Sequence, residues 1–174
     1  MRMFLCCLIC FVGLPFLTAP SAPAQEWTRF RGPNGQGHSA ATNLPESWTE
    51  ADVNWKVALP GQGHSSPVLW GDKIFLQSAD PETATRYIVC LAAADGRELW
   101  RREYASQPHR IHLRNTYGSS TPAVDAERVY VAWSTPARLT LLALDHDGRD
   151  VWDLDLGPVV SEHGFGTSPM LHQD

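Results

Sequence analysis

The sequence predicts an all-β protein, namely a β-propeller of four-stranded antiparallel blades. A strand–turn–strand unit with an Asp-Gly turn and a following tryptophan occurs twice, 52 residues apart. A second phrase, rich in Ser, Thr and Pro, recurs at intervals of 55 and 47 residues. Beyond the N-terminal apolar segment, no stretch has the 3.6-residue period of an amphipathic helix. Short strands that repeat in this way are typical of propeller blades.

The strand–turn–strand unit is clearest in residues 139–156, which read L-T-L-L-A-L-D-H-D-G-R-D-V-W-D-L-D-L. Its first half is an unbroken apolar run, as expected for a strand that is covered on both faces. Its second half alternates apolar and acidic residues around Trp152, which predicts a strand with one exposed face. We expect a two-residue hairpin turn at Asp147-Gly148, because glycine takes a positive φ freely and aspartate tolerates it.

Two further copies of this unit precede it. The first has its turn at Asp95-Gly96 and its tryptophan at Trp100, in the same spacing. The other is a weaker copy, a predicted strand over 52–59 that carries Trp55 but has no blade of its own. In a closed ring this strand would complete the last blade by pairing with strands from the other end of the chain.

The recurring Ser, Thr and Pro phrase opens each repeat, at 63–69, 118–124 and 166–171. A proline at the start of such a strand indicates an edge position, where the missing N–H is not needed. Central strands are predicted over 73–77 and 128–133. The sequence therefore predicts about two complete blades plus partial ones, an open fragment of a propeller. We expect the chain alone to be poorly soluble or oligomeric, because open blades expose apolar faces and strand edges.

The N-terminus reads as a secretory signal peptide over 1–24, with a positive residue at Arg2, an apolar core over 4–17 and cleavage after Ala24. The apolar core is shorter than the roughly 20 residues of a membrane span, so no stable span is expected after cleavage. A retained N-terminal anchor is the alternative. We interpret 25–51 as an extended arm rich in turns. Aromatic residues are expected to pin this arm to the fold: Trp27, Phe30 and Trp48.

Charge and cysteine content limit the possible partners and bonds. The 14 Lys and Arg against 19 Asp and Glu give a net charge of −5, and cleavage removes Arg2 and makes it −6. An acidic chain is a poor partner for nucleic acid or anionic membranes. Three of the four cysteines lie in the predicted signal peptide, which leaves Cys90 alone in the mature chain. The fold must therefore be stabilised by apolar burial without an internal disulfide.

The element A-L-D-x-x-D-G-x-x-x-W, from Ala143 to Trp152, resembles the tryptophan-docking repeat of quinoprotein-type propellers. That group includes the pyrroloquinoline-quinone-dependent alcohol dehydrogenases and cofactor-free relatives such as the outer-membrane assembly propeller. With the phrase that begins at Trp27, the resemblance extends over 27–174, and it implies partial quinoprotein-like propeller repeats over 52–174. Secretion or a periplasmic location is the matching expectation.

The residues of this element also have a physical interpretation. Trp152 can lie over the adjoining blade, where a large flat side chain buries much area. Ala143 is small enough to admit it, Gly148 permits the tight turn, and Asp145 can accept hydrogen bonds from turn amides. In the first repeat, Leu91 and Ala93 are aligned with Ala143 and Asp145, so weaker docking is expected there.

No catalytic, cofactor or metal constellation is predicted. The resemblance to the dehydrogenases implies a calcium-bound quinone held by adjacent cysteines, and the mature chain has no such pair. The recurring serines occupy one place in every repeat, which indicates turn chemistry and no Gly-x-Ser-x-Gly elbow. Loops that lead to opener strands converge near a propeller channel, so histidines there are weak candidates for a ligand or metal site: His64, His109, His112 and His163. Their spacing is not that of a metal site, which favours solvated loop residues.

We therefore predict a non-catalytic secreted or periplasmic propeller that acts as a binding or assembly scaffold for a protein or another ligand, without a cofactor. The alternative is part of a quinone- and calcium-dependent oxidoreductase whose cofactor site lies in blades outside this chain. A third hypothesis is the extracytoplasmic sensor part of a larger protein. The sequence alone does not decide among these functions, because one fold supports many.

Overall fold

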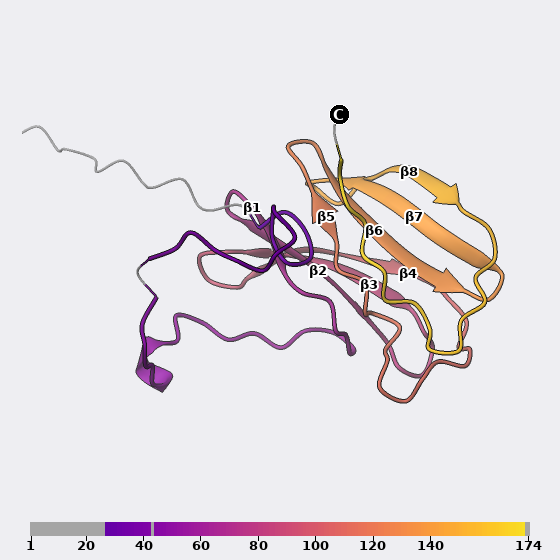
Figure 1. Cartoon of the computed structure of the whole chain (residues 1–174), viewed down its shortest axis with the longest axis horizontal. Helices are drawn as coiled ribbons and strands as arrows, with labels where there is room; N and C mark the ends of the chain where they lie inside the picture. Colours follow the sequence, from indigo (N-terminus) through magenta and orange to yellow (C-terminus); the bar gives the residue numbers. More distant parts are fainter. Residues whose placement is uncertain (1–26, 43, 173–174) are drawn as a thin grey trace, which may run out of the picture.

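The computed structural model describes residues 27–42 and 44–172 (Figure 1). The predicted signal peptide lies outside these residues. Apart from a single 3-10 turn, every regular element in this part of the chain is a strand, and no described helix has the length and apolar character to cross a membrane. The elements are η1 (Glu50–Asp52), β1 (Val68–Trp70), β2 (Lys73–Ala79), β3 (Arg86–Ala92), β4 (Glu98–Tyr104), β5 (Ala123–Val124), β6 (Arg128–Thr135), β7 (Arg138–Asp145) and β8 (Asp150–Asp155).

The strands form two antiparallel sheets, β1-β2-β3-β4 and β5-β6-β7-β8, which we call blade 1 and blade 2. Each sheet follows chain order, so every strand pairs with the next one along the chain. The short opener strands β1 and β5 lie at one edge of their sheets and contact each other, and the tryptophan strands β4 and β8 lie at the opposite edge. The prediction of four-stranded antiparallel propeller blades is confirmed.

The main apolar core lies between the two blades. Because successive strand residues point to opposite faces, alternate residues of β2 and β3 reach blade 2. Phe75 and Ile88 of blade 1 and Val131 of blade 2 are fully buried there. Burial of one such side chain contributes roughly 1.5–3 kcal/mol. The buried members of this core are Val68, Phe75, Ile88, Cys90, Val124, Val129, Val131, Trp133, Leu142 and Leu144.

The predicted strand over 52–59 is wrong. Asp52 is the last residue of η1, where its carboxylate accepts a hydrogen bond from the Thr49 hydroxyl at 2.9 Å. Residues 53–59 have no strand assignment and form no ladder with any described residue. The alternating pattern gives these residues a preference for extended backbone, but a strand exists only where a second strand pairs with it.

The N-terminal arm is attached to both blades by its backbone. The carbonyl of Trp27 accepts a hydrogen bond from Leu69 N at 2.9 Å, and that of Thr28 accepts one from Val124 N at 2.8 Å. The arm thereby bridges the two opener strands. Phe30 and Trp48 are 49% and 72% exposed, so the expectation that aromatic side chains pin the arm is wrong for these two.

Both Asp-Gly turns are longer than the predicted two residues. In blade 2 the loop is 146–148, closed by Gly148 N donating to Asp145 O at 3.0 Å. Only the glycine has a positive φ, +80°, so Asp147 does not adopt the left-handed conformation that the two-residue turn requires. In blade 1 the loop is 93–96, one residue longer.

The extra turn residue changes the correspondence between the repeats. Cys90 is the cross-strand partner of Trp100, and Ala143 is the partner of Trp152. Cys90, and not Leu91, is therefore the structural equivalent of Ala143. The expected weakness of the first repeat, which depended on Leu91, loses its basis, because Cys90 is also a small residue.

Candidate functional site

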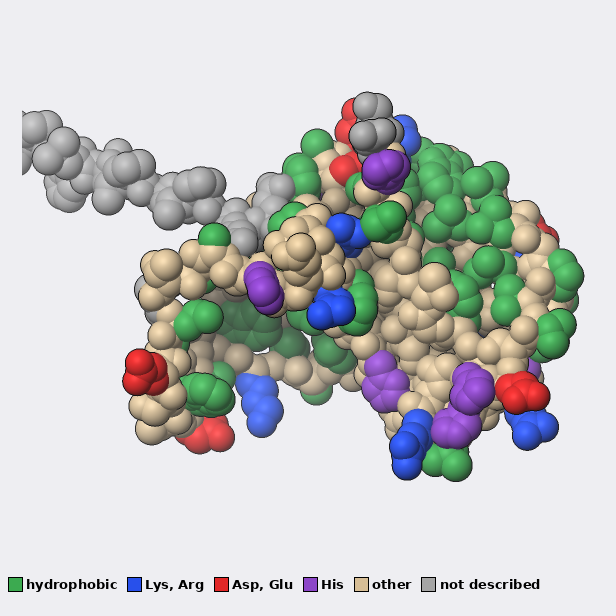
Figure 2. All heavy atoms as spheres, viewed as in Figure 1, with side chains coloured by type: hydrophobic (Ala, Val, Ile, Leu, Met, Phe, Trp, Pro, Cys, Tyr) green, Lys and Arg blue, Asp and Glu red, His purple; other side chains and the backbone are tan. Residues whose placement is uncertain are grey.

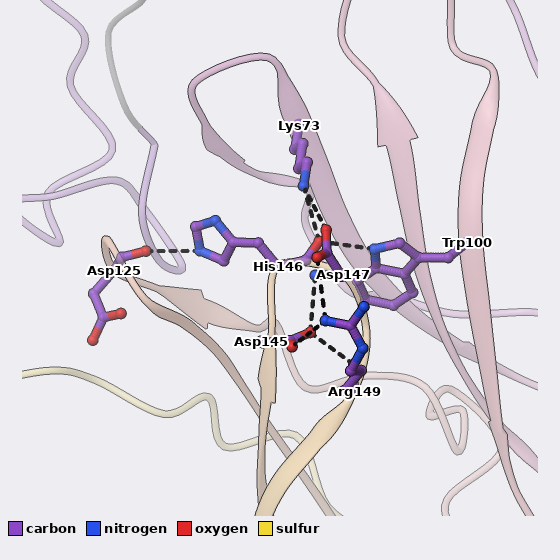
Figure 3. A network of polar contacts seen from close by, with 7 residues as sticks. All are labelled: Lys73, Trp100, Asp125, Asp145, His146, Asp147 and Arg149. Carbon is purple, nitrogen blue, oxygen red and sulfur yellow. Dashed lines mark hydrogen bonds and ion pairs between the residues drawn. The ribbon is translucent and has the colours of Figure 1, made fainter.

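Donors of blade 1 hold the Asp-Gly turn of blade 2 (Figure 3). The indole Nε1 of Trp100 donates to the carbonyl of His146 at 2.9 Å, and Lys73 Nζ donates to the same oxygen at 3.1 Å. Lys73 also lies 3.5 Å from Asp147 Oδ1, and Arg102 Nε donates to the carbonyl of Gly148. Two strands of one blade thus satisfy the carbonyls of a turn in the next blade.

The same turn is packed as well as hydrogen-bonded. The Phe75 ring lies against two others: its centroid is 5.5 Å from that of the His146 ring and 5.9 Å from that of the Trp100 ring. Trp70 also lies near the imidazole, with ring centroids 6.2 Å apart. Gly148 lies so close to Trp100 that an added Cβ would be 2.7 Å from the indole. The close approach therefore requires glycine at this position for space as well as for φ.

Asp145 holds the turn from within. Its Oδ1 accepts hydrogen bonds from Asp147 N at 2.9 Å and from Arg149 N at 2.8 Å (Figure 3). The hydrogen bond from the Arg149 amide is the main cause that lowers the pKa of Asp145 below its usual value. Arg149 Nη1 also pairs with Asp145 at 3.2 Å. The Asp145 carboxylate thus stabilises the conformation of the turn.

Trp55 makes the same kind of contact on the turn of blade 1. Its Nε1 donates to Ala93 O at 3.0 Å, and a Cβ on Gly96 would lie 2.4 Å from its ring. Gly96 has a φ of +71°, and Asp95 Oδ1 accepts a hydrogen bond from the Arg97 amide at 3.0 Å. Residues 53–59 lack a strand, yet Trp55 occupies on blade 1 the place that Trp100 occupies on blade 2.

Trp152 lies at the equivalent position on β8 and contacts its own blade. Its ring centroid is 5.9 Å from that of Tyr130. Its cross-strand partner Ala143 is fully buried. Within residues 27–42 and 44–172, the Trp152 indole N–H donates no hydrogen bond.

A cleft of about 660 Å³ opens where the end of β4 meets blade 2. The rings of Tyr104 and Trp133 stack in its wall with centroids 5.3 Å apart. Tyr104 donates to Asp150, and burial together with this hydrogen bond raises the pKa of the phenol. Arg138 pairs with Asp153 across β7 and β8. The cleft combines an aromatic wall with an ion pair, an arrangement that suits binding.

The four candidate histidines do not converge on one point. His112 and His163 lie together, with ring centroids 5.3 Å apart. His112 Nδ1 accepts a hydrogen bond from the Arg114 amide at 3.2 Å, which occupies one of the two ring nitrogens. His109 instead packs against Tyr117, with ring centroids 5.0 Å apart and the rings tilted by 57°.

His64 is linked to the pair only indirectly. It lies 3.5 Å from Ser119 Oγ, which donates to Asn115 Oδ1 at 2.5 Å. Asn115 Nδ2 donates in turn to His163 O at 2.6 Å. No group of three or more His, Cys, Asp or Glu in the described ranges could hold a metal ion.

The Ser, Thr and Pro phrases interlock from repeat to repeat. Ser66 N donates to Thr121 Oγ1, and Thr121 N donates to Ser168 Oγ, both at 3.0 Å. Ser120 Oγ donates to Thr167 O at 2.9 Å. These hydroxyls bond to backbone groups of equivalent positions in the neighbouring repeat, as structural residues would.

Sequence patterns did not reveal several inter-blade residues. Lys73 is the first residue of β2 and His146 lies in a turn, and nothing in the spacing of either residue indicates a partner in the other blade. Arg86 is almost fully buried, donates to Ser134 O at 3.1 Å and lies over the Tyr117 ring. Its burial lowers its pKa to about 10, whereas burial raises the pKa of Cys90 to about 12 and keeps that thiol protonated.

Comparison with known protein families identifies the family of this chain. No curated protein matches the chain. Among solved structures, the crystal structure of BamB from Moraxella catarrhalis is 22% identical, with a TM-score of 0.49; the match covers 68% of this chain and 34% of that one. The chain thus spans about a third of that protein's length. The family profile described as outer membrane protein assembly factor BamB matches residues 47–157, most of the chain. The chain belongs to this family of propeller proteins.

Proposed function

We propose that the protein is a non-catalytic secreted or periplasmic scaffold whose partners are proteins. The observation that carries the proposal is the match of residues 47–157 to the family of an outer membrane assembly factor. The predicted signal peptide, with cleavage after Ala24, supports an extracytoplasmic location. The family name describes assembly, and a propeller offers broad rigid surfaces for that task.

The geometry supports binding over catalysis. The hydroxyls of Ser120 and Ser168 bond to backbone groups of a neighbouring repeat, the Asp145 carboxylate accepts hydrogen bonds from its own turn, and Cys90 is buried with a raised pKa. A nucleophile needs an accessible position and an adjacent base that takes its proton. Ser119 Oγ lies 3.5 Å from His64 Nδ1, but its hydroxyl donates to Asn115 Oδ1 at 2.5 Å and not to the imidazole. The inter-blade cleft instead offers an aromatic wall beside the exposed segment that includes Gln107.

Site-specific cross-linking tests this function in the producing cells. With p-benzoylphenylalanine in place of Gln107 in the cleft, we expect discrete protein adducts; the same replacement at exposed Glu46 of the arm is the control. The mature protein from these cells should begin at Gln25 in its mass spectrum. The scaffold proposal fails if both positions give the same adducts or if neither gives any. A chain that still carries residues 1–24 would contradict the proposed secreted or periplasmic location.

The quinone-dependent alternative makes the opposite prediction about cofactor binding. We expect no saturable heat when the mature chain is titrated with pyrroloquinoline quinone and calcium, because its only cysteine is buried and no pair exists to hold the ring. Titration with EDTA in place of calcium measures the background heat. A micromolar or tighter site would favour the oxidoreductase function.

A further inference from the structure

The N-terminal arm contains a tight loop over residues 29–37 that carries two arginines. Residues 27–42 include Arg29, Arg31 and His38 but no Asp or Glu, although the whole chain is acidic. Neither arginine forms an ion pair in the part of the chain that the structure describes. On the face shown in Figure 2, basic side chains and a histidine lie where the arm crosses the blades, and no acidic side chain lies among them. The loop is therefore a local centre of positive charge.

This loop is rigid and is attached to the blades through the residues directly before it, whose carbonyls bond to both opener strands. Gly32, with a φ of +78°, lies so close to Trp27 that an added Cβ would be 2.7 Å from the indole. Within the loop, Gly32 N donates to Arg29 O at 2.9 Å and Gly37 N donates to Arg31 O at 2.8 Å. Both arginines thus start from a defined backbone.

The two guanidinium groups fold back over the same short segment. Arg29 Nη2 donates to Pro33 O at 3.2 Å, and Arg31 Nη2 donates to Gln36 O at 3.4 Å. Because these two carbonyls are only three residues apart in the chain, the guanidinium groups lie over one face of the loop. A guanidinium has five N–H donors. Each of these groups donates a single hydrogen bond within the described residues, so most of their donors remain available to a ligand.

The backbone of the loop is adapted to this arrangement. Arg31 has a φ of +63°, a conformation that residues other than glycine seldom adopt. Strained positions of this kind tend to occur at functional sites. Gly35, at a φ of +69°, lies beneath Arg29, where an added Cβ would be 3.1 Å from Nη2. Glycine at this position therefore lets the guanidinium approach the loop.

The charge and the donors select the class of ligand. A neutral or cationic ligand would leave both positive charges uncompensated. A carboxylate has two oxygens, which a single guanidinium already fills in a bidentate pair. A phosphate group offers more oxygens and carries up to two negative charges, so two guanidinium groups can share it. Two fixed arginines without a carboxylate partner therefore favour a phosphate group.

We propose that Arg29 and Arg31 form a binding site for a phosphate group, carried by a soluble ligand or by a lipid headgroup. The site lies outside the inter-blade cleft, to which no residue of the arm contributes. It goes beyond the proposed scaffold function and does not depend on it. The negative net charge of the chain disfavours anionic partners in general, whereas this loop is basic and attracts them locally.

Two probes test the site and distinguish the two sources of phosphate. Inorganic phosphate is titrated into the mature chain at low salt and followed by phosphorus NMR. Flotation with phosphatidylcholine vesicles that contain phosphatidic acid, compared with phosphatidylcholine alone, measures lipid binding. We expect saturable binding of at least one probe, weakened by added salt. Binding of phosphate alone identifies a soluble ligand, and binding of the phosphatidic acid vesicles alone identifies a headgroup. Binding of neither probe would overturn the proposal.

Arginine variants locate the binding. Arg29→Lys and Arg31→Lys keep the charge but remove the planar fork, and each should weaken binding about tenfold. Arg114→Lys is the matched control, because Arg114 is also exposed and has no ion pair within the described ranges. This variant should bind as the wild type does. Unchanged binding by both arm variants, or an equal loss in Arg114→Lys, would show attraction to surface charge in general and overturn the assignment.

Gly35→Ala tests the position of the guanidinium while every charge is kept. Its methyl group would displace the Arg29 side chain, so we expect weaker binding. Gly71→Ala is the control for a positive φ, because Gly71 has a φ of +58° and an added Cβ there meets no atom within 4 Å. Near-ultraviolet dichroism checks that both variants are folded. If Gly35→Ala binds as tightly as Gly71→Ala does, Arg29 does not bind phosphate from this loop, and the proposed site is wrong.

Discussion

Gly148→Val is expected to lower the free energy of unfolding by about 2–5 kcal/mol. Two terms produce this loss. A non-glycine residue at a φ of +80° costs roughly 1–2 kcal/mol, because its Cβ approaches the carbonyl oxygen. The added side chain would also meet the Trp100 indole at 2.7 Å, and overpacking of this kind costs about 1–3 kcal/mol. Urea unfolding followed by far-ultraviolet dichroism measures the sum.

A second glycine separates the two terms. Gly71 has a φ of +58°, and an added Cβ there would meet no atom within 4 Å. Gly71→Val should therefore show the conformational cost alone, about 1–2 kcal/mol. In a Trp100→Ala background the cost of Gly148→Val should fall to the same range, since the clash is then absent. Equal losses at Gly71 and Gly148 in the wild-type background would contradict the contact between Gly148 and Trp100.

The strands of the fold were predictable because each carries its own local pattern. The apolar run before Asp145 and the alternation around Trp152 specify β7 and β8 without knowledge of their neighbours. The predicted strand over 52–59 shows the limit of that logic. Its pattern is as regular as that of β8, but strand formation also depends on a partner, which residues 53–59 do not have among the described residues.

The candidate site was predictable in its tryptophans, its glycines and Asp145, which accepts hydrogen bonds from the turn amides as expected. The repetition of the tryptophans and glycines at one spacing is visible in a single sequence, whereas the hydrogen-bond acceptors of the tryptophans are main-chain carbonyls, which carry no sequence signal. Lys73 acts through the His146 carbonyl, and nothing in the identity of either residue indicates that pairing. The turn length was also not predictable, because Asp-Gly suits two-residue and longer hairpins alike.

Phe75→Ala is expected to cost about 3–5 kcal/mol of unfolding free energy, since Phe75 is fully buried at the junction of the two blades. Its ring contacts both the His146 imidazole and the Trp100 indole, so the truncation leaves a cavity beneath the turn that Trp100 holds. Phe75→Leu keeps most of the volume and should cost less than about 1.5 kcal/mol. Urea unfolding followed by tryptophan fluorescence reports the loss, because Trp100 itself lies in the affected contact.

Phe30→Ala is the matched control, because Phe30 is 49% exposed and should change stability by no more than about 0.5 kcal/mol. The comparison tests whether the two blades unfold as one unit. If Phe75→Ala lowers stability no more than Phe30→Ala does, the core between the blades does not contribute to the cooperative transition, and each blade unfolds by itself. Phe75 belongs to blade 1 and its partner His146 to blade 2. A large loss of stability in Phe75→Ala alone, equal by fluorescence and by far-ultraviolet dichroism, would therefore show that the fold depends on the contact between the blades.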